Sequence, residues 1–265
     1  MDLKAFRPCG PDIGCPRGVR SATSLAALAS LRACRQRATV EATAQCIGAL
    51  PLMKGVSPSD LHLLALSARV HRVERGAPAV MTGQHLAIVV SGLLQVSVAD
   101  ADRRQPVYLV GPGQLCGEQD VLRAARHDHA VEAVERSDVL LIRAEAFLSV
   151  AQRSPALMRR LARILSARIL HVTDTIEMMT RRSASERVAA FLLCLSRCDA
   201  VAHKMGYLVL PVRKRIVAAL LDVSSESLSR ILSRFQALGM IEQSGLMVRV
   251  LDREGLERQA FAAAA

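Results

Sequence analysis

The feature that most restricts the fold of this chain is a change in hydrophobic spacing near its middle. Between Val70 and Ile142, short β-prone runs alternate with glycines, and Leu93–Val98 has a period of two. Before these runs, Ser57-Pro58-Ser59-Asp60 supplies the cap of an expected short helix. From Ser154-Pro155 onward the spacing becomes helical. Short strands with glycine punctuation predict an antiparallel barrel or roll. The predicted strands are Val70–Val73, Ala79–Met81, Ala87–Val90, Leu93–Val98, Val107–Val110, Ala130–Val134 and Val139–Ile142.

One long helix is expected to begin at Ser154-Pro155, because proline is tolerated at the first helical position. Its apolar residues recur at alternating steps of four and three and form one stripe: Leu161, Leu165, Ile169, Val172, Ile176 and Met179. The opposite face carries Arg160, Arg163 and Arg168. A long, narrow stripe of this kind predicts a coiled-coil dimer seam. The alternative is a helix that docks on its own roll.

The C-terminal third has the order of a winged helix-turn-helix. Ser183 and Glu186 form a predicted capping box that starts a helix over Ala184–Cys198. Helical patterns follow at Arg213–Leu221 and Ser224–Leu238, and a hairpin follows at Met240–Leu251. The chain is therefore expected to be α+β. We divide it into an N-terminal arm (1–45), an antiparallel β-roll (46–150), a dimerisation helix (151–182) and a winged helix-turn-helix (183–265).

Composition narrows the class of partner. The net charge of +11 favours a polyanion, with nucleic acid the first candidate and an anionic membrane surface the second. Aromatic residues make up only 3% of the chain, which argues against a surface that stacks single-stranded bases. The sequence has no apolar run of about 20 residues, so we expect no membrane span and a cytoplasmic protein. Since no phosphate loop, catalytic nucleophile or metal motif occurs, we do not expect an enzyme.

The segment Ser224–Phe235 carries the strongest functional signal. On a helix its apolar residues share an inward face, whereas Glu226, Ser229 and Arg230 share another. Arginine, a carboxylate and a small hydroxyl suit major-groove readout, and they lie near the end that a recognition helix inserts. Ser225 and Ser227, together with Ser233 and Arg234, are candidates for phosphate contacts.

These residues resemble the recognition helix of the Crp/Fnr family of transcription regulators, and the anaerobic-regulator (Fnr) branch is the nearest match. The resemblance rests on Glu226-x-x-Ser229-Arg230 followed by Arg234-Phe235-Gln236 and Gly239-Met240. It extends to the turn at Gly92, to Gly111–Glu118 and to Ser183–Phe191, and covers about Cys46 to Leu256.

The resemblance implies specific roles. Arg230 would contact guanine, Glu226 the cytosine or adenine of the paired strand, and Ser229 a thymine, within two-fold sites whose half-sites are like TTGAT. Arg213 and Lys214 would hold phosphate. A homodimer and contact with RNA polymerase are also implied. The family usually has glycine in the turn between the two helices, whereas this chain has Asp222; aspartate tolerates a left-handed conformation better than most residues.

The sequence defines the regulatory input of the protein less well than its expected DNA contacts. Gly117 and Glu118 match the ribose-binding pair of family members that bind cyclic nucleotides, but Asp128 stands near the expected Arg-Ser pair, so we do not expect a nucleotide. An iron–sulfur cluster needs about four thiolates. Candidate ligands are Cys9, Cys15, Cys34, Cys46 and Cys116, although their spacing is irregular.

Several other hypotheses about the regulatory input stay open. The alternatives to a cluster are simple thiol chemistry, haem bound through His62, His71, His85 or His171, and cysteines that only pack in the core. The sequence therefore predicts a DNA-binding regulator that responds to a redox, oxygen or small-molecule signal. The alternative is a redox or haem sensor that acts through a protein partner.

Overall fold

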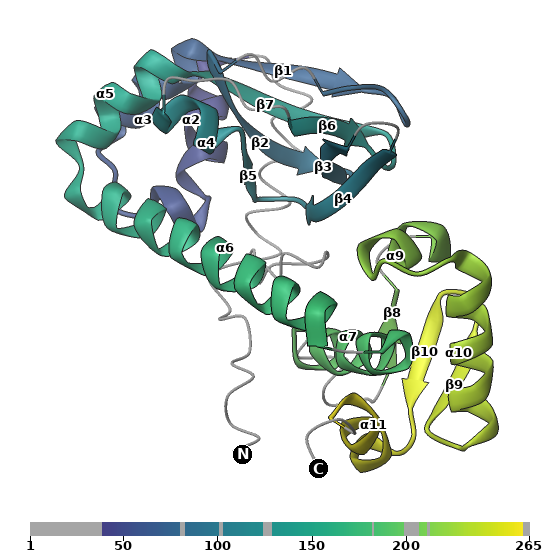
Figure 1. The fold of residues 1–265 in the computed structure, drawn as a ribbon. Coiled ribbons are helices and arrows are strands. Elements are labelled where there is room, and N and C mark those ends of the chain that lie inside the picture. Colours follow the sequence, from purple (N-terminus) through teal and green to yellow (C-terminus); the bar gives the residue numbers. More distant parts are fainter. Residues whose placement is uncertain are drawn as a thin grey trace. The chain divides into compact units, whose positions relative to one another are not determined.

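The structure is a computed structural model that describes residues 39–79, 83–100, 103–123, 129–181, 183–198, 207–210 and 213–261. The chain divides between Arg168 and Ile169 into two compact units. The first holds two antiparallel sheets and the helices packed on them (Figure 1). The second holds a helical bundle with a small sheet.

The first unit is the predicted antiparallel roll. One sheet has the order β1-β7-β2-β5 and the other β4-β3-β6, and every pair is antiparallel. The bounds are β1 Ala68–Val73, β2 His85–Ser91, β3 Leu94–Asp100, β4 Arg103–Val110, β5 Leu115–Cys116, β6 His129–Ala133 and β7 Ser137–Arg143. These strands confirm most of the predicted runs. Of the run at Ala79–Met81, only Ala79 is described, beside a single bridge between Pro78 and Glu132.

Strands β2 and β7 separate two apolar cores. Alternate residues, such as Ile88 and Leu140, face a core shared with helices, whereas Val89 and Val139 face a core between the two sheets. Gly92 follows β2 with a φ of 86°, and a Cβ there would lie 2.3 Å from Ser137 Oγ. Only glycine therefore fits the turn that links the strands of the roll.

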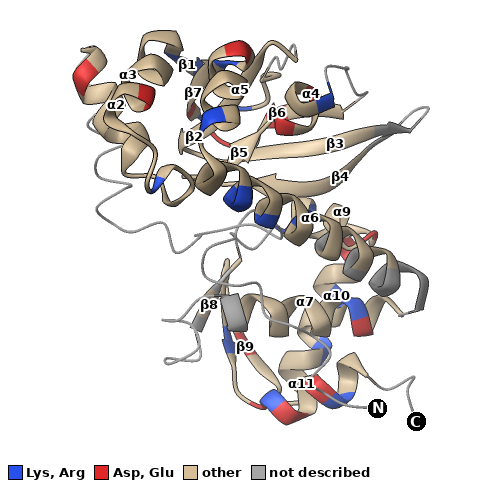
Figure 2. Cartoon of the chain, turned by 90° about the vertical axis from the view of Figure 1, so that its left-hand side faces the viewer, with Lys and Arg blue, Asp and Glu red and all other residues tan. Residues whose placement is uncertain are grey.

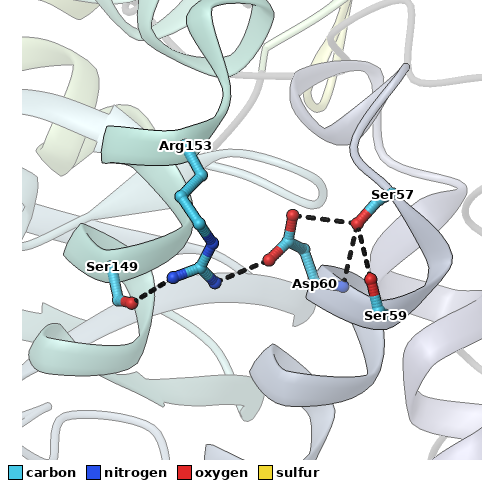
Figure 3. Close-up of polar contacts among 5 residues, drawn as sticks. All are labelled: Ser57, Ser59, Asp60, Ser149 and Arg153. Atoms are coloured by element: carbon cyan, nitrogen blue, oxygen red, sulfur yellow. Dashed lines mark hydrogen bonds and ion pairs between the residues drawn. The ribbon is translucent and has the colours of Figure 1, made fainter.

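Helices close the first core: α2 Val40–Gly48, the 3-10 helix Pro51–Met53, α3 Pro58–Ser67, α4 Glu118–Arg123 and α5 Ala144–Arg153. Residues 40–45, which the sequence places in the N-terminal arm, belong to α2, and α4 and α5 are absent from the sequence-based prediction. Ser57 caps α3 as predicted, since its Oγ accepts from the backbone N–H of Asp60. Figure 3 shows how Arg153 of α5 reaches Asp60, 2.6 Å away, and so ties α5 to α3.

Helix α6 runs from Pro155 to Arg181 and starts where the sequence predicts. Its first turns belong to the roll, because Leu157 and Leu161 are buried in the core formed with the helices. The break at Ser154 separates α6 from α5.

The second unit has the predicted winged helix-turn-helix order. Its elements are α7 Ala184–Cys198, β8 Tyr207–Val209, α9 Lys214–Leu220, α10 Ser225–Ala237, β9 Ile241–Ser244, β10 Met247–Val250 and α11 Arg253–Ala260. The capping box is confirmed: Ser183 N–H donates to Glu186 Oε2 and Glu186 N–H donates to Ser183 Oγ. The wing has a third strand that the sequence does not predict, since β8 pairs with β10.

Candidate nucleic-acid interface

Helix α10 presents one apolar face and one polar face. Leu228, Leu232 and Phe235 are buried, and they fix the helix against the rest of its unit. Ser224 caps the N-terminus, because its Oγ accepts from Ser227 N–H at 3.0 Å. The polar face is thereby held outward on a helix that cannot rotate without exposing Phe235.

The predicted base-reading residues lie together on that outward face. Glu226, Ser229 and Arg230 are all exposed. Arg230 Nη2 lies 3.9 Å from Glu226 Oε1, and the two side chains are 72% and 80% exposed. An ion pair this solvated contributes little and can rearrange at low cost. Figure 2 shows that α10 carries both basic and acidic residues.

The predicted phosphate contacts differ in accessibility. Ser225 is exposed at the first turn of α10, whereas Ser227 is half-buried and its Oγ lies 2.9 Å from Ser224 Oγ. Arg213 is exposed at the N-cap position of α9, and Lys214 follows it, half-buried. Arg215 is exposed as well and completes a run of three cations that the sequence analysis did not single out.

The apolar stripe of α6 divides between two environments, which corrects the seam that we predict from sequence. Leu161 is 1% exposed and lies in the core of the roll, so it has no surface left for a second chain. Leu165 also packs against that core. In contrast, Ile169 is 66% exposed and Ile176 58% exposed, and Val172 and Leu170 are exposed as well. The side chain of Met179 lies outside the described residues.

A second prediction, that Arg168 lies on the face of α6 opposite the apolar stripe, is wrong: like Leu161 it faces the roll. It does not lie on a solvated face of α6, because its guanidinium is ion-paired with Glu118 Oε1 and donates to the Leu115 carbonyl at 2.6 Å. It also lies over the ring of Tyr108, 5.0 Å from the centroid. Glu118 is fully buried, and its Oε2 lacks a hydrogen-bond partner in the part of the chain that the structure describes.

This contact bears on nucleotide binding. The carboxylate that would hold a ribose by family resemblance already has a cationic partner from α6 and no exposed surface. Residues 124–128, where the phosphate-binding pair would fall, lie outside the described residues.

The candidate cluster ligands separate into three groups. Cys9, Cys15 and Cys34 lie outside the described residues. Cys46 is buried in the core formed with the helices, and Cys116 is buried in the core between the sheets. Burial raises the pKa of the Cys116 thiol to about 11, which disfavours the thiolate that a metal requires. Cys116 therefore does not fit as a ligand, and the described residues contain no group of three or more potential metal ligands.

Comparison with known proteins identifies both parts of the chain. A family described as "Crp-like helix-turn-helix domain" matches residues 186–259, and one described as "Cyclic nucleotide-binding domain" matches residues 79–154. None of the helices that the structure describes is long and apolar enough to cross a membrane.

Similar proteins include one named as a transcriptional activator. The chain is 29% identical to the cyclic AMP receptor protein of Thermus thermophilus over 216 residues. This aligned region covers 80% of this chain and 97% of the relative. It is 29% identical over 210 residues to the transcriptional activator FnrA of Stutzerimonas stutzeri, covering 75% and 86%. The structure of FixK2 from Bradyrhizobium japonicum has a TM-score of 0.63 at 26% identity and covers 72% of this chain and 96% of that protein.

Proposed function

Because this chain belongs to the Crp/Fnr family of transcription regulators, we propose that it regulates transcription by reading duplex DNA with α10 in the major groove. One observation carries the proposal most directly. Glu226, Ser229 and Arg230 share the exposed face of a helix whose opposite face is buried. Three side chains of the right chemistry thus stand near the inserted end of a fixed helix.

Each residue has a role in this proposal. Arg230 donates two hydrogen bonds to guanine, Glu226 accepts from the base paired on the other strand, and Ser229 contacts a thymine. The ion pair between Arg230 and Glu226 opens as the bases replace it. Arg213 and Lys214 at the start of α9, together with Ser225 and Ser227, contact phosphates and set the register without specifying sequence. The half-site is TTGAT-like.

The functional unit is a homodimer joined along the second half of α6. The exposed residues Ile169, Val172 and Ile176 recur at helical spacing and suit a two-stranded seam. Two recognition helices would then read half-sites about one helical turn apart.

The signal, whether redox, oxygen or a small molecule, enters at the roll or the N-terminal arm. Of the five candidate cluster ligands, Cys46 and Cys116 are both buried in apolar cores, so a cluster would depend first on Cys9, Cys15 and Cys34. The burial of Glu118 supports an input other than a cyclic nucleotide. The family resemblance extends the proposal to contact with RNA polymerase and to a cytoplasmic location.

Selection from a pool of random duplexes tests the proposal. The wild-type chain is expected to enrich a two-fold sequence with TTGAT-like half-sites. Arg230→Ala should cost about 1–3 kcal/mol and relax choice at a single base pair of each half-site. Binding that loses no preference in this variant would show that α10 does not read bases. A chain that selects no sequence would instead favour a sensor that acts through a protein partner.

A further inference from the structure

The turn between α9 and α10 contains the most unusual backbone in the second unit. Asp222 has a φ of 50°, and it is the one non-glycine residue with a positive φ in the described parts of the chain. Val223 N–H donates to the Ala218 carbonyl at 2.9 Å, and Asp222 N–H donates to the Ala219 carbonyl at 3.2 Å. This pair of bonds is the Schellman ending of a helix, whose left-handed position is usually glycine.

A side chain from another helix holds this turn. Arg187 of α7 donates from Nε to the Leu221 carbonyl at 2.8 Å and from Nη2 to the Asp222 carbonyl at 3.0 Å. A guanidinium is a rigid planar fork, so the two bonds fix the relative positions of both carbonyls. Its charge also lies at the C-terminal end of α9, where the helix dipole favours a cation.

Arg187 is itself well anchored. It follows Glu186 of the capping box, and the next residues of α7, Val188–Leu193, are buried. Helix α7 also contacts α10 and α11. Arg187 thus contacts the turn from a firmly packed helix, and Asp222 lies three residues before the start of α10 at Ser225.

We propose that Arg187 is a positioning residue for DNA recognition: its guanidinium holds Asp222 in the left-handed conformation and so sets the angle at which α10 meets DNA. Arg187 touches no base in this proposal. It compensates for the aspartate that stands where a glycine would be unstrained. The DNA readout rests on the proposed function, whereas the contact with the turn does not.

A double-mutant cycle between Arg187→Met and Asp222→Gly tests this coupling. The measured quantity is the ratio of affinities for the duplex selected by the wild type and for a random duplex of equal length. Arg187→Met should lower this ratio about tenfold, since charged hydrogen bonds to two carbonyls are lost. In the Asp222→Gly background the same change should lower it less than about threefold, because glycine adopts the turn unaided.

Equal losses in the two backgrounds, or an unchanged ratio, would overturn the proposal. Arg258→Met is the matched control, because it removes an equally charged side chain that is 72% exposed on α11. Arg187→Lys replaces Arg187→Met in the cycle if the latter does not fold, since an ammonium keeps the charge and loses the fork.

Thermal unfolding of the same variants without DNA separates the two proposals. Arg187→Met should lower the unfolding temperature more in the wild-type background than in the Asp222→Gly background. If the wild-type chain selects no DNA sequence, the proposed function fails, and this measurement still decides the inference: additive shifts would overturn it.

Discussion

At the scale of single residues, the ion pair between Glu118 and Arg168 is held inside the first unit. Its carboxylate is fully buried, one oxygen pairs with Arg168, and the other lacks a partner among the described residues. The Arg168 side chain is 16% exposed and has further acceptors in the Leu115 carbonyl and the Tyr108 hydroxyl. Removing one charge from such a pair leaves the other buried and uncompensated.

Glu118→Gln is therefore expected to destabilise the protein by about 3 kcal/mol, and Arg168→Met by at least as much. The double variant should lose less than the sum, because neither charge remains. Urea unfolding of the full chain measures all three free energies. Glu135→Gln, at an exposed position, is the control and should change stability by about 0.5 kcal/mol or less. Strictly additive losses would show that the pair is not coupled.

The position of Arg168 shows what a sequence leaves undetermined at this scale. The prediction places Arg168 opposite the apolar stripe, but it follows Leu161 by seven residues, about two helical turns, and faces the roll with it. Its partner Glu118 is 50 residues away in the sequence. Periodicity gives the direction of a side chain and not what meets it. The outward face of α10 was predictable because its inward residues, such as Leu228 and Phe235, define it within a single helix.

At the scale of helices, too, the sequence predicts what depends on local interactions and misses what depends on distant partners. The sequence predicts α3 from its cap at Ser57, since capping is a local interaction. It does not predict α5, whose Arg153 donates to Asp60 at 2.6 Å and to Ser149 at 2.7 Å. The run Ala144–Arg153 is short and directly follows a buried strand, so periodicity alone does not separate it from the sheet.

The contact between α3 and α5 should depend on pH. The hydrogen bond from Arg153, followed by that from Ser57, holds the pKa of Asp60 below its ordinary value of 3.8. A carboxyl whose folded pKa is lowered adds stability that is fully present above the unfolded pKa and is lost as pH falls through the folded pKa. The stabilisation should therefore persist at neutral pH and disappear in acid.

A double-mutant cycle between Arg153→Met and Asp60→Asn measures this effect. The coupling at pH 7 should be about 1 kcal/mol or less, because half of the Arg153 side chain is solvated. It should fall toward zero as the pH drops below 3.8 and through the lowered folded pKa of Asp60, where the carboxyl takes up a proton. A coupling that is constant across this range would mean that packing, and not charge, links the two helices.

At the scale of the whole molecule, one end of the α6 stripe is buried and the other is exposed. The sequence predicts one continuous stripe, and an amphipathic pattern does not say which surface it meets. The roll buries Leu161, and four apolar residues beyond it stay exposed in the single chain: Ile169, Leu170, Val172 and Ile176. A second copy of the chain would cover them by a two-fold interface in which each residue is used twice.

Ile169→Lys tests this arrangement, because the symmetry places two added charges in one seam. Loss of two buried isoleucines should weaken the dimer by about 3 kcal/mol or more, which exceeds a hundredfold in dissociation constant. Sedimentation should show monomers, and affinity for a two-fold site should fall toward that for a half-site. Leu66→Lys, which alters an apolar residue that is 60% exposed on α3, is the control and should stay dimeric. If Ile169→Lys also stays dimeric, the protomers join elsewhere and the spacing of the two recognition helices is not set by α6.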